Sequence, residues 1–166
     1  MKNISAKYIG LITGGLMVLI SLIMFYQFHF PDTGTVKYVC YTIYTISIII
    51  SLINFKRANT DKEFKDYFSE GFKTFVVVSL IMALFTWIFY KMNPQIFDNI
   101  INDINKINAL DPNKTPQEVI ENGEKIRNIR IPMTVAINTI IYMVLGALVT
   151  AISAGFLSQQ SNHNQS

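Results

Sequence analysis

Uncharged, mostly apolar stretches recur four times along this 166-residue chain, over residues 8–30, 38–55, 74–90 and 131–157. A helix needs about 20 mostly apolar residues to cross a bilayer, and roughly 17–25 are tolerated. The pattern therefore predicts an all-α membrane protein with four transmembrane helices in an antiparallel bundle. Their approximate bounds are 8–30, 38–55, 72–91 and 131–157.

Small and polar residues form a stripe along each predicted span, at spacings of three and four. Such a repeat keeps one seam facing a partner helix, and in lipid the interfaces are built from small residues and hydroxyls. We therefore expect a self-packed four-helix bundle. A second row of small residues on the fourth span leaves a homo-oligomer open. The stripes are Gly10, Gly14, Met17 and Ser21; Cys40, Tyr44, Ser47, Ser51 and Asn54; Ser79, Ala83, Thr86 and Tyr90; and Thr139, Met143, Gly146, Thr150 and Ser153; the second row is Ala147, Ala151 and Gly155.

The segment before the third span, residues 60–71, has the pattern of an amphipathic helix. Thr60 and Glu63 have the spacing of a capping box, in which each side chain bonds the other's backbone N–H. Aromatic residues then follow on one helical face, with Gly71 at the end. This predicts a short helix lying in the inner interface, which directs the third span. An anionic-lipid contact or a partner docking site is the functional alternative.

The third loop, residues 92–130, is predicted to hold two helices outside the membrane. Asn93-Pro94 and the capping box Thr115-Pro116-Gln117-Glu118 mark their starts. Pro132 is expected to begin the fourth span as a separate helix. We predict an ordered first helix with apolar residues toward the mouth of the bundle (Phe97, Ile100, Ile101 and Ile104) and polar residues outward (Asn99, Asp103 and Lys106). Residues 158–166 are expected to form a disordered tail, and residues 1–166 a single membrane domain.

The basic residues predict the orientation, because cytoplasmic loops are enriched in Lys and Arg. Lys2 and Lys7 precede the first span, and five bases lie between residues 56 and 73. Both termini and the second loop are therefore expected in the cytoplasm of a bacterial inner membrane. The bases that precede the fourth span, Lys125, Arg127 and Arg130, point the other way. The first span is longer than a signal-peptide core and ends in residues 25–30, without small residues for cleavage, so we expect it to stay attached.

The spans carry little reactive chemistry. Cys40 is the single cysteine, and the most polar candidates are Asn138 in the fourth span and His29 at the end of the first. A lone amide in a bundle usually bonds a neighbouring helix, and His29 beside Asp32 is a poor site because the two lie at the membrane rim. We therefore predict no catalytic, cofactor-binding or metal-ligating residue and no nucleic-acid partner.

Several segments together resemble a known family. They are the opening Lys7-Tyr8-Ile9-Gly10-Leu11-Ile12-x-Gly14, the run Phe64-Lys65-Asp66-Tyr67-Phe68-x-x-Gly71-Phe72-Lys73, Asn93-Pro94, a charged outer loop and the last helix with Gly146. In this order they are similar to the Bacteroidetes domain-of-unknown-function family numbered 4199. The resemblance implies a four-span inner-membrane protein and supplies no activity, cofactor or site residue. The chain has no charge after Arg130, so a basic tail expected of relatives is missing.

Three functional classes remain. The first is a non-enzymatic membrane component, accessory or sensor-like, whose outer loop meets a membrane-protein partner. The second is an oligomeric pore or small carrier, suggested by the hydroxyl stripes. The third, with the least support, is an intramembrane or lipid-modifying enzyme, which needs a nucleophile and a base at one depth. In every case the lipid bilayer is a partner.

Overall fold

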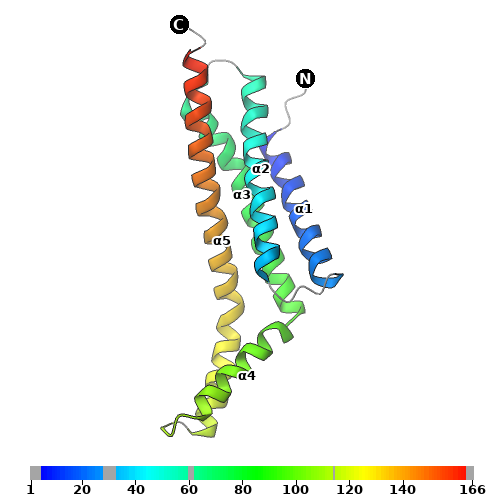
Figure 1. Cartoon of the computed structure of the whole chain (residues 1–166), viewed down its shortest axis with the longest axis vertical. Helices are drawn as coiled ribbons and strands as arrows, with labels where there is room; N and C mark the ends of the chain where they lie inside the picture. The colour runs from blue at the N-terminus through cyan, green and yellow to red at the C-terminus, as the bar shows by residue number, and fades with distance from the viewer. Residues whose placement is uncertain (1–4, 28–32, 60–61, 114, 164–166) are drawn as a thin grey trace. The chain divides into compact units, whose positions relative to one another are not determined.

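The computed structural model describes residues 5–27, 33–59, 62–113 and 115–163, and these residues form helices without a strand (Figure 1). Four of the helices are long and apolar enough to cross a membrane, namely α1, α2, α3 and α5. The predicted all-α fold, with four helices able to span a membrane, is thus confirmed. The helices are α1 (Ala6–Tyr26), α2 (Thr33–Ala58), α3 (Phe64–Met92), α4 (Gln95–Ala109) and α5 (Pro116–His163).

The chain divides into two compact units. Unit 1 comprises residues 1–82 and 139–166, and unit 2 comprises residues 83–138. Both α3 and α5 contribute a segment to each unit.

In unit 1 the helices alternate in direction. Ala6 contacts Glu70 near the start of α3, and Gly14 faces Ile81 further along, so α1 and α3 run parallel. In α2, Phe55 packs on Tyr67 while Ser51 bonds Thr74, so α2 runs antiparallel to α3. These contacts give the up-down bundle that the four uncharged stretches predict.

Small residues let the helices of unit 1 approach closely. A Cβ added to Gly10 would lie 3.0 Å from the Val77 Cβ, and one on Gly146 would lie 2.6 Å from the Phe75 Cβ. A Cβ on Gly71 would lie 2.8 Å from the Thr150 Oγ1. The α1–α3 and α3–α5 crossings therefore depend on glycine, as expected for helices that associate in lipid.

The third span differs from the prediction at its start. α3 begins at Phe64 and continues to Met92, so the amphipathic segment 60–71 is not a separate interfacial helix; its last two turns belong to α3. Gly71 lies inside α3 at a close contact with Thr150, and Tyr67 and Phe75 are buried on the same side of the helix. The Asp66 carboxylate accepts the Glu63 N–H at 3.3 Å, whereas Thr60 and Asp61 lie outside the described residues.

The fourth span also differs. Pro132 was expected to begin a new helix, but it lies inside the 48-residue α5. A proline interrupts one backbone hydrogen bond, and helices that cross membranes tolerate this where neighbouring groups compensate. The expected disordered tail is helical through His163, while residues 164–166 lie outside the described residues. No glycine or proline follows Gly155 to end the helix.

Unit 2 contains α4 and the adjoining parts of α3 and α5. Tyr90, Phe97 and Ile101 form its buried apolar cluster, and Ile126 and Ile131 of α5 pack against them. The Tyr90 and Phe97 rings lie 4.8 Å apart. Phe97 and Ile101 of the predicted apolar stripe are therefore buried inside unit 2, and Ile104 is half-buried. The structure does not describe the side chains of Asn99 and Ile100.

Candidate functional site

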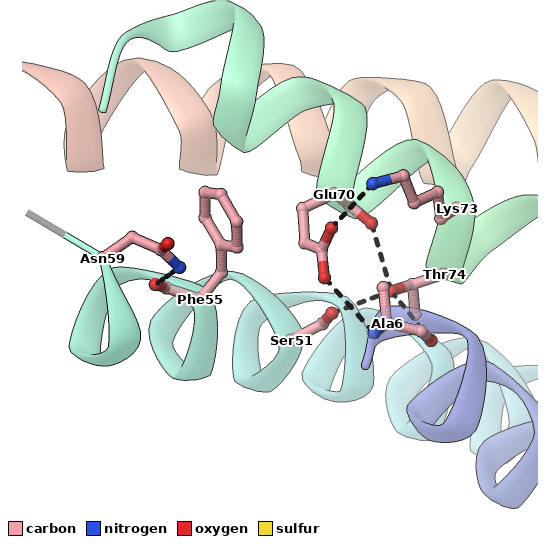
Figure 2. Close-up of polar contacts among 7 residues, drawn as sticks. All are labelled: Ala6, Ser51, Phe55, Asn59, Glu70, Lys73 and Thr74. Carbon is pink, nitrogen blue, oxygen red and sulfur yellow. Dashed lines mark hydrogen bonds and ion pairs between the residues drawn. The ribbon is translucent and has the colours of Figure 1, made fainter. Parts of the chain in front are cut away.

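A carboxylate is buried at the end of unit 1 where α3 begins. The Glu70 side chain is 12% exposed, and it lies on the same helical face as Tyr67 and Thr74. Its Oε1 accepts the Ala6 backbone N–H at 3.2 Å, and its Oε2 pairs with the Lys73 ammonium at 3.1 Å (Figure 2). Two opposing groups therefore compensate the buried negative charge.

The Glu70–Ala6 contact caps α1 from another helix. The first N–H groups of a helix have no intrahelical acceptor, and a negative charge there is favourable. Ser5 is the N-cap residue of α1 but makes no side-chain capping bond. Glu70 supplies the missing acceptor and so fixes the start of α1 on α3.

Hydroxyl groups extend this contact to α2. The Ser51 and Thr74 hydroxyls lie 2.8 Å apart, and the Thr74 Oγ1 is 3.5 Å from the Ala6 carbonyl oxygen (Figure 2). We call Glu70, Ala6, Lys73, Thr74 and Ser51 the Glu70 network. Because it joins α1, α2 and α3 with balanced charge, its chemistry fits helix anchoring.

Glu70 is absent from the sequence-based predictions, which considered segment 60–71 only as an amphipathic helix at the membrane surface. A signal was present: Glu70 falls between Tyr67 and Thr74 at helical spacing, with Lys73 three residues on. An acid on an otherwise apolar face that has a basic residue within one turn indicates a buried, paired carboxylate.

In unit 1 the predicted stripe of α1 is buried, and that of α2 is buried except for the half-buried Asn54. Gly10, Gly14, Met17 and Ser21 are buried on α1, and Cys40, Tyr44, Ser47 and Ser51 on α2. Of the α5 stripe, Gly146 and Thr150 are buried, whereas Thr139, Met143 and Ser153 are half-buried.

The hydroxyls of the stripes bond within unit 1. Tyr44 donates to the Tyr142 carbonyl at 2.9 Å, which joins α2 to α5. The Ser21 hydroxyl and the Cys40 thiol lie 3.5 Å apart, which joins α1 to α2. Ser47 donates to the Tyr44 carbonyl of its own helix. These polar groups therefore serve helix packing.

A polar groove lies between α4 and the first turns of α5, within unit 2. Its volume is about 590 Å³, which falls in the range of small-ligand pockets. Asparagine carboxamides and one Glu–Arg combination supply its polar groups, with isoleucines beside them. The lining residues are Ile101, Asn102, Asn105, Ile120, Gly123, Glu124, Arg127 and Asn128.

Two contacts shape this groove. Arg127 of α5 pairs with Asp98 of α4 at 2.9 Å. A Cβ on Gly123 would lie 2.7 Å from the Asn105 carboxamide nitrogen, so glycine allows that side chain to lie against α5. The Asn105 Oδ1 is buried without a hydrogen-bond partner.

The ends of α4 and α5 match the sequence signals in part. The Thr115 capping box is confirmed: the Thr115 N–H donates to Glu118 at 2.7 Å, and the Glu118 N–H donates to the Thr115 hydroxyl at 3.3 Å. Asn93 does not cap α4, whose N-cap residue is Pro94. Its side chain instead donates to the Phe89 carbonyl at 2.9 Å and so completes the end of α3.

Asn138 belongs neither to the Glu70 network nor to the lining of the groove. Asn138 is half-buried in α5, and His29 and Asp32 lie outside the described residues. Among the residues that the structure describes, no three His, Cys, Asp or Glu side chains are grouped to hold a metal ion.

The comparisons with known proteins identify a family but not an activity. Neither a curated protein nor a solved structure matches the chain. Residues 8–159 match the family model for the protein of unknown function DUF4199. This match begins inside α1 and ends inside α5. It includes the whole of unit 2 and every member of the Glu70 network except Ala6. Because nearly the entire chain is matched, this protein belongs to the DUF4199 family.

Proposed function

We propose that this protein is a non-enzymatic accessory or sensor-like component of the inner membrane of a Bacteroidetes bacterium. In this proposal both termini are cytoplasmic, and α4 with the start of α5 meets a partner on the opposite side. The observation that carries the proposal is the polar groove of unit 2. Arg127 lines this groove and is ion-paired with Asp98. The groove offers a polar recognition surface, whereas the hydroxyls of unit 1 are packed between helices.

Site-specific photocrosslinking tests the proposed recognition surface. A photoreactive benzoylphenylalanine is placed at Asn102 or Asn128, which both line the groove, and at Ile107 as the control. Ile107 lies on α4 outside the groove and is 69% exposed. We expect one discrete product shared by Asn102 and Asn128 and absent for Ile107. Identical products at all three positions, or none at the groove positions, would contradict the proposal.

The orientation requires its own experiment. We expect Ser69→Cys to be protected from a membrane-impermeant thiol reagent in intact cells and Asn108→Cys to be labelled. Cys40 is buried and contributes little background. The reverse labelling pattern would invert the topology.

An oligomeric pore or carrier is the second candidate function, and Gly155 is the observation that favours it. A Cβ on Gly155 would meet nothing within 4 Å, so this part of the Ala147, Ala151 and Gly155 row is open for a second copy. The hydroxyls of Tyr44, Ser47 and Ser51 count against a pore inside one subunit because they bond within unit 1. Ion flux in proteoliposomes, abolished by Gly155→Leu, would favour this candidate.

A further inference from the structure

The net positive charge of this protein lies outside residues 91–130. The net charge is +3, yet residues 91–130 hold six bases and six acids. The excess therefore lies elsewhere in the chain. Near the start of α1, the end of α2 and the start of α3, the described residues include six bases and three acids. These are Lys7, Lys56, Arg57, Lys62, Lys65 and Lys73, with Glu63, Asp66 and Glu70.

The contacts of unit 1 bring these three helix ends together. Ala6 of α1 lies 3.2 Å from the Glu70 carboxylate of α3, and the Phe55 ring near the end of α2 lies 5.6 Å from the Tyr67 ring. Figure 1 shows the start of α1, the end of α2 and the start of α3 at one end of the bundle. Their basic residues therefore occupy one end of unit 1.

One of the three acids at this end, Glu70, is compensated by a basic side chain. Glu70 is buried and paired with Lys73, and Asp66 accepts the Glu63 N–H at 3.3 Å. Lys7, Arg57 and Lys65 are exposed, and Lys62 is half-buried. The surface that remains is positively charged.

Aromatic side chains lie beside these bases. Phe64 and Phe72 are 45% and 46% exposed, and both rings lie on the outer side of α3, spaced by two helical turns. Phe68, between them, stacks on Phe64 with ring centroids 5.9 Å apart. Exposed phenyl rings next to lysines are typical of segments that insert at the boundary of headgroups and acyl chains.

We propose that this surface binds the headgroups of anionic phospholipids. We define the basic rim as Lys7, Arg57, Lys62 and Lys65 together with Phe64 and Phe72. The lysines and the arginine attract the headgroup phosphates, and the phenyl rings enter the adjoining acyl region. The charge complementarity selects an anionic lipid over a zwitterionic one, and the proposal is independent of the groove in unit 2.

Native mass spectrometry of the full-length protein tests this proposal, with phosphatidylglycerol and phosphatidylcholine as the probes. The variant is Lys62→Gln/Lys65→Gln, and the control is Lys106→Gln/Lys125→Gln, which removes the same charge from unit 2. The unmodified protein is expected to retain phosphatidylglycerol preferentially. In the rim variant this preference is expected to fall about fivefold for each lysine removed. Each basic residue near an anionic surface contributes about 1 kcal/mol to binding, which corresponds to this factor.

The outcomes are distinguishable. Equal retention of the two lipids by the unmodified protein would overturn the proposal, as would equal losses in the rim and control variants. Soluble glycerol 1-phosphate is added as a competitor. If glycerol 1-phosphate does not displace phosphatidylglycerol, the basic rim binds a lipid surface. If it displaces the lipid fully, the rim is instead a site for a free phosphate ester and the lipid proposal is overturned. Equal thermal midpoints of the two variants in phosphatidylcholine show that both are folded.

Discussion

Two buried threonines illustrate how different the roles of one residue type are in this bundle. Thr74 and Thr150 are both fully buried. The Thr74 hydroxyl lies 2.8 Å from the Ser51 hydroxyl and joins α3 to α2. The Thr150 hydroxyl has no hydrogen-bond partner, and the side chain packs on Gly71. Burial alone therefore does not reveal whether a hydroxyl stabilises the fold.

The same substitution should consequently have opposite effects at these positions. Thr74→Val leaves the Ser51 hydroxyl without this partner and should lower the free energy of unfolding by about 1 kcal/mol. Thr150→Val keeps the shape and removes an uncompensated polar atom, so stability should be unchanged or higher. Thermal unfolding in one detergent compares the two variants. A loss at Thr150 as large as that at Thr74 would show that the Thr150 hydroxyl has a stabilising partner.

The Glu70 carboxylate is predicted to hold the start of α1. Glu70→Ala removes the acceptor of the Ala6 N–H and the partner of Lys73, whereas Glu70→Gln keeps an acceptor and loses the charge. Amide hydrogen exchange over residues 6–10 should therefore be fastest in the Ala variant and intermediate in the Gln variant. The expected loss of local stability in Glu70→Ala is about 1–3 kcal/mol. Glu63→Gln, at an exposed position, is the control.

A result in which exchange over residues 6–10 is the same in Glu70→Ala and in the unmodified protein would contradict the anchoring role. In that case another group would cap α1, because Ser5 does not do so through its side chain.

At the scale of elements, periodicity predicted the spans well but not their limits. The spacing of Cys40, Tyr44, Ser47 and Ser51 identified the buried face of α2, because helix packing repeats every three or four residues. Local start and stop signals were less informative. Pro132 lies inside α5, and the Asn93 side chain bonds the last turn of α3 instead of capping α4. Proline and capping residues are compatible with a helix end, but a helix end need not occur where they stand.

The candidate sites were harder to predict than the spans. Glu70 is buried because it pairs with Lys73 and accepts the Ala6 N–H of another helix. Ala6 lies far from Glu70 in sequence, so the residues around Glu70 could not predict this contact. The groove of unit 2 depends on Gly123 facing Asn105, which are 18 positions apart in sequence. The apolar stripe of α4, with Phe97 and Ile101, and the capping box at Thr115 indicated that this region was ordered.

The packing of α4 leads to a prediction about its order. Phe97 is 7% exposed and Ile101 is 3% exposed, whereas Ile107 is 69% exposed on the same helix. Phe97→Ala should cost about 3–5 kcal/mol in unit 2, and Ile101→Ala about 2–5 kcal/mol. Either change should therefore accelerate amide exchange over residues 95–107, and Ile107→Ala should not. Rapid exchange over these residues in the unmodified protein would show that α4 is not held in place.

At the scale of the whole molecule, polarity is distributed as expected for a protein surrounded by lipid. The buried core of unit 1 contains the hydroxyls of Ser51, Thr74 and Ser79. Large apolar side chains lie on the outer faces of its helices, among them Ile12, Leu80 and Phe156. In lipid there is no hydrophobic drive to bury such side chains, so helix association depends on close approach and interhelical hydrogen bonds.

Two glycines of α5 therefore separate packing within one subunit from contacts between copies. A Cβ on Gly146 would lie 2.6 Å from the Phe75 Cβ, whereas one on Gly155 would meet nothing within 4 Å. Gly146→Leu should force α5 away from α2 and α3 and cost about 1–3 kcal/mol or more, the range for overpacking. Gly155→Leu should leave the unfolding midpoint of a monomer unchanged. Thermal unfolding and size-exclusion chromatography with light scattering measure both properties for each variant. A Gly155→Leu protein that is smaller in solution but equally stable would reveal an oligomer built on that row, and equal destabilisation by both substitutions would mean that Gly155 also faces the bundle.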